Sequence, residues 1–217
     1  MTADTYEITL PDHHWLSLPQ KYFREAGDGA EATQETLVRL RQDGDILTVE
    51  FECHGNPFWR QNTYKEDNTS LWKQEVFEIF IAAGEATPSR YIELEINPND
   101  ALFVGSVHNP GPQGDGIKLT MVPPKESGIS HKITQTTAST WRGELHIPLK
   151  FVNGSAGDAV DSVYRVNFYR IVLLEPQADP NWECTPENSS FQCWSPTLSG
   201  AKPHFHRPER FGVLRLL

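Results

Sequence analysis

Two short stretches decide the fold: residues 75–81 read EVFEIFI and residues 91–97 read YIELEIN. Side chains alternate between the two faces of a β-strand. In the first stretch, alternation places Phe77, Ile79 and Ile81 on one face and Glu78 on the other, and the second stretch separates its aliphatic residues from its glutamates in the same way. The two stretches therefore predict neighbouring strands of an antiparallel hairpin with one apolar face toward a core.

The rest of the chain repeats this pattern. Short segments rich in β-branched and aromatic residues are bounded by Gly, Pro, Asn or Asp, which is typical of strands and turns. We expect strands at residues 46–53, 76–81, 90–97, 101–107, 117–122, 132–137, 141–147, 163–174 and 213–217. A weak helical turn is expected at residues 18–25. Many short strands predict an all-β fold, an antiparallel β-sandwich of jelly-roll or immunoglobulin-like type, formed as a single domain over residues 1–217.

The charge balance is acidic. With 19 Lys and Arg against 29 Asp and Glu, the formal net charge is −10, and such a surface repels the phosphate backbone of nucleic acids. No apolar run approaches the roughly 18 residues that a membrane-spanning helix needs, and Met1 to Leu10 lacks the basic and apolar regions of a secretory signal. The chain as written predicts a soluble cytoplasmic protein without nucleic-acid or membrane partners. An extracytoplasmic location stays open if a signal was removed.

The cysteines are Cys53, Cys184 and Cys193. An odd number cannot form a complete disulfide framework. Cys184 and Cys193 lie close enough along the chain for one loop disulfide, and the sequence leaves their pairing open.

A polar surface is predicted beside an aromatic side chain. If the first two strands are hairpin neighbours, Glu78 shares a face with Glu93, Glu95 and Asn97, next to Trp72. A pyranose presents hydroxyl groups that bind carboxylates and amides, and C–H faces that pack on aromatic rings. Two long irregular segments, residues 55–71 and 175–206, hold further tryptophans, and long loops in compact domains are usually functional or disordered. The pattern favours a sugar-binding surface.

Several sequence blocks, in order, resemble the signature blocks of family 9 carbohydrate-binding modules, which are related to DOMON-like sandwiches. The blocks are TYKED at 63–67, LW at 71–72, EVFEIFI at 75–81, YIELEINP at 91–98, NFYR at 167–170, WSPT at 194–197 and FHRPERFG at 205–212. The resemblance runs from about residue 35 to the C-terminus. It implies a β-sandwich that binds carbohydrate without transforming it.

The resemblance also implies a site in which a terminal sugar or a small saccharide is held between two tryptophans. Trp72 matches the first, and Trp194 is the match for the second, with Trp182 in the same loop as the alternative. Glu78 matches a carboxylate that binds sugar hydroxyls, and Asn97 matches a sugar-binding amide.

One position departs from the family pattern. Well-known members place an arginine two residues before the amide, whereas this chain has Glu95, so an acceptor replaces a donor. We expect Glu95 to take part in orienting the sugar. Arg170 could supply the missing donor, but alternation places it with Val166 and Phe168 on the inner face. A buried pairing with a carboxylate is its alternative role.

Other functions are weighed against sugar binding. The first alternative is a structural or interaction sandwich whose sugar site has decayed, because of Glu95. The second is a glycoside hydrolase, which needs two carboxylates about 5–10 Å apart, a geometry that Glu78 and Glu95 could meet across neighbouring strands. No cofactor is required, although oxygen ligands for a structural calcium gather at Asn97, Asn99 and Asp100, where turn formation is the simpler reason for them. The oligomeric state stays open.

Overall fold

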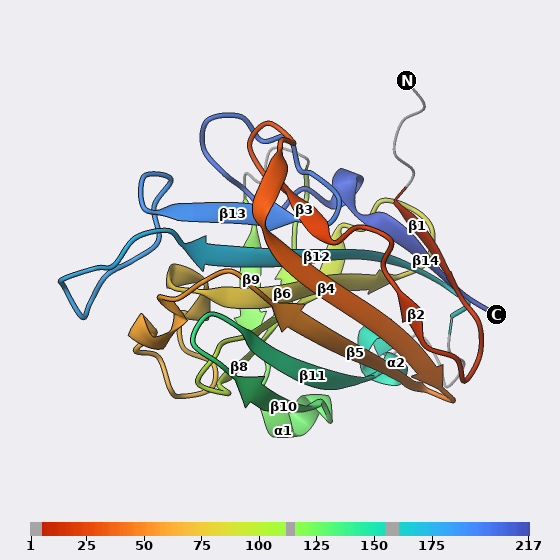
Figure 1. The fold of residues 1–217 in the computed structure, drawn as a ribbon. Helices are drawn as coiled ribbons and strands as arrows, with labels where there is room; N and C mark the ends of the chain where they lie inside the picture. Colours follow the sequence, from red (N-terminus) through yellow and green to blue (C-terminus); the bar gives the residue numbers. More distant parts are fainter. Residues whose placement is uncertain (1–5, 112–115, 155–160) are drawn as a thin grey trace.

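The computed structural model describes residues 6–111, 116–154 and 161–217. Its strands form two packed β-sheets (Figure 1). The first sheet has the order β3 (Tyr22–Glu25), β13 (Ser189–Cys193), β12 (Val163–Leu173), β6 (Val76–Ala83), β7 (Arg90–Ile96), β8 (Leu102–His108) and β9 (Lys118–Met121). The second has the order β10 (Ser130–Thr136), β11 (Trp141–Pro148), β5 (Ile46–Cys53), β4 (Glu31–Asp43) and β2 (Leu16–Ser17).

Two connections complete the sandwich. The start of β4 pairs with β3 of the first sheet, and from Thr36 onward the same strand pairs with β5 of the second. The second half of β12 pairs with β13, whereas its first half pairs with β14 (Gly212–Leu216). β1 (Glu7–Leu10) pairs in parallel with β14. All other strand pairs among the described residues are antiparallel. The prediction of an antiparallel β-sandwich is confirmed, with this one parallel pair added.

Helical structure is limited to single turns. The described residues include the 3-10 helices η1 (Trp59–Gln61), η2 (Leu71–Lys73) and η4 (Pro208–Arg210) and the short α-helices α1 (Pro124–Ser127) and α2 (Leu149–Asn153). None of these helices has the length or the apolar character required to span a bilayer.

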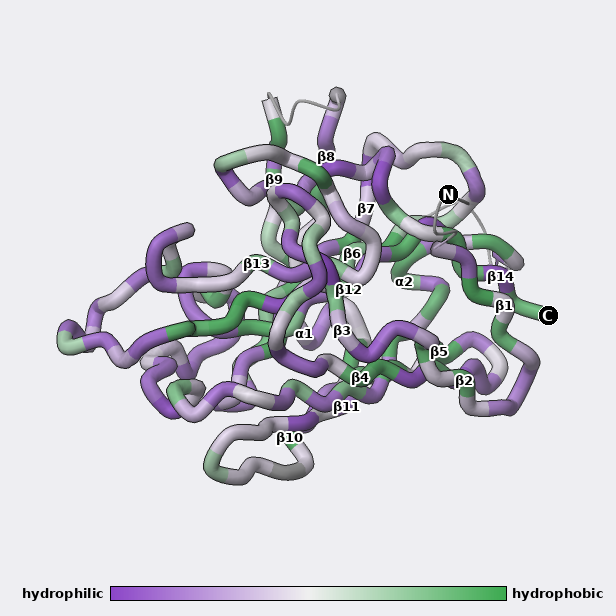
Figure 2. Tube along the Cα trace, turned by 45° about the horizontal axis from the view of Figure 1, so that its top comes forward, coloured by the Kyte–Doolittle hydropathy of each residue, from purple (hydrophilic) through white to green (hydrophobic). Residues whose placement is uncertain are grey.

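The main core lies between the two sheets. The inner face of β6 contributes Phe77, Ile79 and Ile81, as the alternation predicts, and Phe77 stacks on Phe51 of β5 at 4.2 Å between ring centroids. Strand β11 alternates strictly between buried and partly exposed residues. In Figure 2, hydrophobic and hydrophilic stretches are mixed around the labels of β4, β5 and β11. The second sheet therefore has one face in the core and one toward solvent.

The first sheet is different, because both of its faces are covered. Its outer face carries a second apolar cluster that includes Val76, Phe80, Tyr91 and Tyr169. The segment 194–211, which follows β13, packs over this face through Phe205 and other aromatic residues. A sheet covered on both faces has apolar side chains in both alternating sets, which is what β6 shows.

Several details differ from the sequence-based expectations or settle a point that the sequence left open. The helical turn expected at residues 18–25 is wrong, because residues 22–25 form β3 and pair with β4. The segment 175–206, expected to be irregular, contains β13. All three cysteines are free thiols, so Cys184 and Cys193 form no disulfide.

Gly212 offers a first test of the packing. A Cβ at this position would fall against the ring of Trp194 and 2.5 Å from the backbone oxygen of Tyr6. We expect Gly212→Ala to destabilise the fold by about 1–3 kcal/mol, as overpacking of a core does. Urea denaturation measures the loss. Gly111→Ala is the control, because its Cβ would meet no atom within 4 Å, and equal losses in both variants would contradict the packing described.

Candidate functional site

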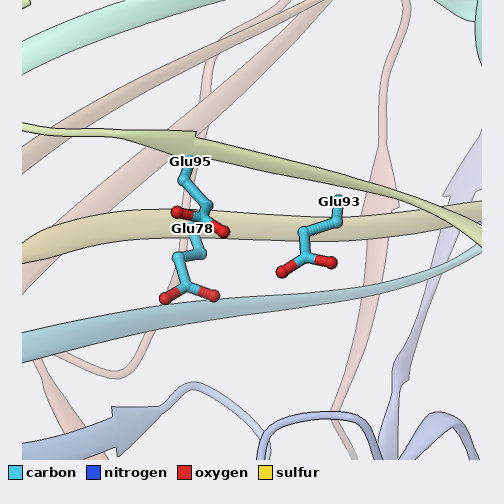
Figure 3. A group of neighbouring side chains, drawn as sticks. All are labelled: Glu78, Glu93 and Glu95. Carbon is cyan, nitrogen blue, oxygen red and sulfur yellow. The ribbon is translucent and has the colours of Figure 1, made fainter. Parts of the chain in front are cut away.

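The hairpin of β6 and β7 brings three carboxylates together on the outer face of the first sheet. Glu78 lies directly opposite Glu95, and Phe80 lies opposite Glu93. The glutamates therefore leave the two strands on the same side, as alternation predicts (Figure 3). One carboxylate oxygen from each residue lies within 4.8 Å of one from each of the other two. We call Glu78, Glu93 and Glu95 the carboxylate trio.

The carboxylate trio is buried, although the sequence suggested a solvent-facing surface. Glu78 is 1% exposed, Glu93 5% and Glu95 0%, because the apolar residues of the outer face and the segment 194–211 surround them. Burial disfavours a charged carboxylate. It is the main reason why the pKa of Glu93 rises to about 7 and why the pKa values of Glu78 and Glu95 rise well above their ordinary value.

Mutual repulsion adds to the effect of burial. The charge of Glu93 raises the pKa of Glu78, and the charges of Glu78 and Glu93 raise that of Glu95. A hydrogen bond between the carboxyl groups of Glu93 and Glu95 lowers the pKa of Glu93 and raises that of Glu95. Outside the carboxylate trio, neither oxygen of Glu95 has a partner in hydrogen-bonding geometry, although the backbone of Trp72 lies close enough to offset part of the rise in its pKa. No basic side chain of the described residues contributes to the pKa of any of the three.

A cleft of about 350 Å³ opens above the carboxylate trio. Glu78 and Glu93 form part of its floor, and Trp72 forms part of its wall. Trp72 is 39% exposed and is held at a steep angle against Phe103, with 5.4 Å between the ring centroids. The remaining lining residues are Phe80, Ile117, Leu119, Ile171, Phe191, Pro203, His204, Phe205 and His206. The cleft thus combines apolar and aromatic walls with a carboxylate floor.

Hydrogen bonds from the sheet fix the part of the cleft lining formed by Phe205 and His206. The Tyr169 hydroxyl donates to the backbone oxygen of Phe205 at 3.1 Å, and the Tyr91 hydroxyl bonds to Nδ1 of His206 at 2.7 Å. Burial lowers the pKa of His206 to about 4, and burial also lowers the pKa of His204. Both imidazoles are therefore neutral near pH 7, and the lining contains no lysine or arginine.

The second expected tryptophan platform is not formed. Trp194 is 1% exposed and lies in the core between the sheets, where its ring meets Tyr6 and Phe168 edge-on and its Nε1 donates to Gln20 at 2.9 Å. The alternative, Trp182, is also buried and donates to the backbone oxygen of Gln61. A buried indole has no free face for a sugar. The expectation that Trp194 or Trp182 pairs with Trp72 is not met in this structure.

Asn97 and Arg170 also have structural contacts in place of a position in the cleft. The Asn97 amide donates to the backbone oxygen of Tyr64, and its side-chain oxygen accepts from the backbone nitrogens of Asn99 and Ala101. Arg170 is fully buried on the inner face, 3.5 Å from a Glu75 oxygen. The buried pairing with a carboxylate, considered as an alternative for Arg170, is confirmed.

The oxygen-rich turn considered for calcium is engaged by the chain itself. The side-chain oxygen of Asn97 accepts two backbone hydrogen bonds, as described above. Oδ1 of Asp100 accepts from the backbone nitrogen of Ile133 at 2.8 Å and contacts His131. Asn99 donates its amide to the backbone oxygens of Asn62 and Tyr64. These contacts fix the connection between β7 and β8.

A larger hollow of about 550 Å³ lies over β4, β5 and β11 of the second sheet. Four of its charged side chains form ion pairs with one another, Arg39 with Glu50 and Arg142 with Glu52. In the cleft, by contrast, no cationic side chain of the part of the chain that the structure describes pairs with the carboxylates. The cleft is therefore the stronger candidate for a binding site, despite its smaller volume.

A curated relative decides the family. An extracellular protein of Arthroderma benhamiae (strain ATCC MYA-4681 / CBS 112371) is 31% identical to this chain over an alignment of 170 residues, which covers 74% of this chain and 75% of that protein. The chain belongs to the family of this extracellular protein. No family model matches the sequence of this chain.

Solved structures share the fold of this chain over nearly its whole length. A candidate carbohydrate-binding protein from Bacteroides uniformis ATCC 8492 gives a TM-score of 0.69 at 13% identity, over 97% of this chain and 99% of that one. A family 9 carbohydrate-binding module from Caldicellulosiruptor kristjanssonii, solved with cellotriose and with glucose, gives a TM-score of 0.54 at 13% identity in both complexes. Those alignments cover 97% of this chain and 93% or 95% of the module. The similarity to family 9 modules that the sequence suggested is thus shown at the level of the fold.

Proposed function

We propose that the protein binds carbohydrate, without catalysis, in the cleft beside Trp72. The observation that carries the proposal is the half-exposed indole of Trp72 at the edge of a cleft whose floor contains Glu78 and Glu93. An aromatic face packs against the C–H groups of a pyranose, and carboxylates accept from its hydroxyls. Small-molecule sites have volumes of roughly 300–1,000 Å³, so a cleft of about 350 Å³ fits a terminal sugar or a small saccharide.

The binding mode differs from the one expected from the sequence. One tryptophan, Trp72, would provide the stacking platform, and the wall formed by Phe191 and Phe205 would replace the second. Glu93, which was not among the expected ligand residues, joins Glu78 on the floor, and the alternation of residues 91–97 already indicated its side of the strand.

The fold and the relative support the proposal. The family 9 module that shares this fold was solved with glucose and with cellotriose. The Arthroderma benhamiae relative is an extracellular protein, and we propose an extracellular location for this chain, where carbohydrate polymers are found.

Removal of the stacking platform tests the proposal. In calorimetric titrations with a panel of glucose, xylose, cellobiose, chitobiose and other small saccharides, we expect at least one ligand to bind. Trp72→Ala should weaken that binding at least about 30-fold, since an aromatic anchor often contributes about 2 kcal/mol or more.

Trp15→Ala is the matched control. Trp15 is 38% exposed, much like Trp72, but it precedes β2 on the second sheet. Binding that survives Trp72→Ala would refute the assigned cleft. An absence of binding across the panel would favour a decayed site, and release of reducing ends by the pure protein would show hydrolysis instead.

A further inference from the structure

The carboxylate trio has acceptor atoms without donors. Of its six carboxylate oxygens, four lack a hydrogen-bond donor from the described residues outside the trio: Oε1 of Glu78, Oε2 of Glu93 and both oxygens of Glu95. Within the trio, the carboxyl groups of Glu93 and Glu95 can share one proton. Buried polar atoms nearly always have partners, and an exception requires an explanation. The unpartnered atoms are more than nine-tenths buried, and two of the three residues line the cleft.

The ionisable groups around the trio do not supply a positive charge. His204 and His206 line the cleft and have lowered pKa values. The hydroxyls of Tyr91 and Tyr169 and the thiols of Cys184 and Cys193 have raised pKa values, so these groups stay protonated and neutral. Three buried carboxylates without a counter-charge are unfavourable unless they are protonated or bind a cation.

We propose that Glu78, Glu93 and Glu95 bind a hard divalent cation of the calcium, magnesium and manganese class. The donor set consists of carboxylate oxygens, which these ions prefer. Two oxygens bound to one such ion at about 2.0–2.6 Å cannot be more than about 5 Å apart, and oxygens of the trio lie within 4.8 Å of one another. The group contains no sulfur or imidazole ligand, which disfavours softer metals.

The position of the trio leaves one side of the ion open to the cleft. Glu78 and Glu93 form part of the cleft floor, so water or a ligand oxygen can complete the coordination from above. If the proposed carbohydrate binding is correct, a sugar hydroxyl would take this position, and sugar affinity would depend on the metal. This last step rests on the proposed function, whereas the cation site itself does not.

Calorimetry of the full chain after treatment with EDTA and buffer exchange tests the site. Calcium, magnesium and manganese are titrated separately, up to about 10 mM, which covers the weakest class of protein calcium sites. We expect at least one ion to bind with a stoichiometry of one per chain. Binding should release protons, because part of the trio is protonated near pH 7, and repeating the titration in two buffers of different ionisation enthalpy counts them.

Isosteric variants separate the site from general charge effects. Glu95→Gln and Glu93→Gln should each weaken binding at least tenfold and reduce the number of protons released. Glu126→Gln in α1 removes an exposed carboxylate with the same change of charge and should bind like the wild type. Circular dichroism of each metal-free variant verifies that it is folded.

Three outcomes would overturn the cation site. One is the absence of a heat signal and of a melting-temperature shift with all three ions. Another is unchanged affinity in both trio variants. The third is that no metal binds and the protein binds glucosamine more tightly than glucose. The trio would then be a site for the ammonium group of an amino sugar. If no metal binds and the protein binds sugar equally well in EDTA and in added metal, only the cation site is overturned. If a metal binds but no sugar does, only the proposed function is overturned.

Discussion

Arg170→Met is expected to destabilise the protein by about 3–5 kcal/mol, the usual cost of removing one partner of a buried ion pair. Arg170 and Glu75 are both fully buried, and Arg170 also donates to the backbone oxygens of Glu35 and His54. Glu75 accepts from Trp141 Nε1 at 2.8 Å and from Asn56. Without the guanidinium, the Glu75 carboxylate stays buried with neutral donors alone. Urea denaturation at pH 7 measures the loss.

Two further variants make this test specific. Glu75→Gln combined with Arg170→Met should recover part of the stability, because no charge is then left buried. Lys73→Met breaks the exposed pair of Lys73 with Glu183 and should change stability little. A loss below about 1 kcal/mol in Arg170→Met would contradict the buried pair described here.

The second large effect is a loss of stability as the pH rises. The folded-state pKa of Glu93 is raised to about 7 from 4.5, so its contribution to stability is fully present below about pH 4.5 and is lost as the pH rises through about 7. One pKa unit corresponds to about 1.4 kcal/mol, so Glu93 alone accounts for a loss on the order of 3 kcal/mol. Glu78 and Glu95 act in the same direction.

His206 acts in the opposite direction over part of this range. Its folded-state pKa is lowered to about 4 from 6.5, so it adds stability as the pH rises between those values. The decline is therefore clearest above about pH 6.5. Urea denaturation in EDTA from pH 6.5 to 8.5 measures the part that Glu78 and Glu95 continue. The contribution of Glu93 itself is measured from pH 4.5 to 7, where the stability of the wild type should fall relative to that of Glu93→Gln by on the order of 3 kcal/mol. Stability that increases over this range in the wild type would contradict the buried trio.

The strand pattern of the hairpin could be predicted from the sequence. Strict alternation in residues 76–81 and 91–97 separates two faces, and the register of β6 and β7 places Glu78 opposite Glu95 accordingly. The burial of these glutamates could not be predicted from alternation alone, because it depends on the segment 194–211, which is distant in the sequence. A signal was present nonetheless: Val76 and Phe80 flank Glu78 on its own face, and a strand that is apolar on both faces is normally covered on both.

The role of each tryptophan was less predictable. An indole in a loop can pack inward or outward, and the sequence near Trp194 and Trp182 does not distinguish the two. The decisive contacts come from other parts of the chain. Gln20 accepts from Trp194, and Gly212 leaves room for its ring. Strand β4 was not among the expected strands, although Val38 and Leu40 alternate with polar residues there.

The parallel pairing of β1 with β14 has a consequence for biosynthesis. β1 is synthesised long before β14, and β14 is the strand with which β1 pairs. During synthesis the chain therefore carries Ile8 and Leu10, both buried in the folded protein, without the strand they dock on until β14 has been made. Unpaired strands and exposed apolar side chains promote aggregation, so β1 is a segment that chaperone protection would benefit during synthesis.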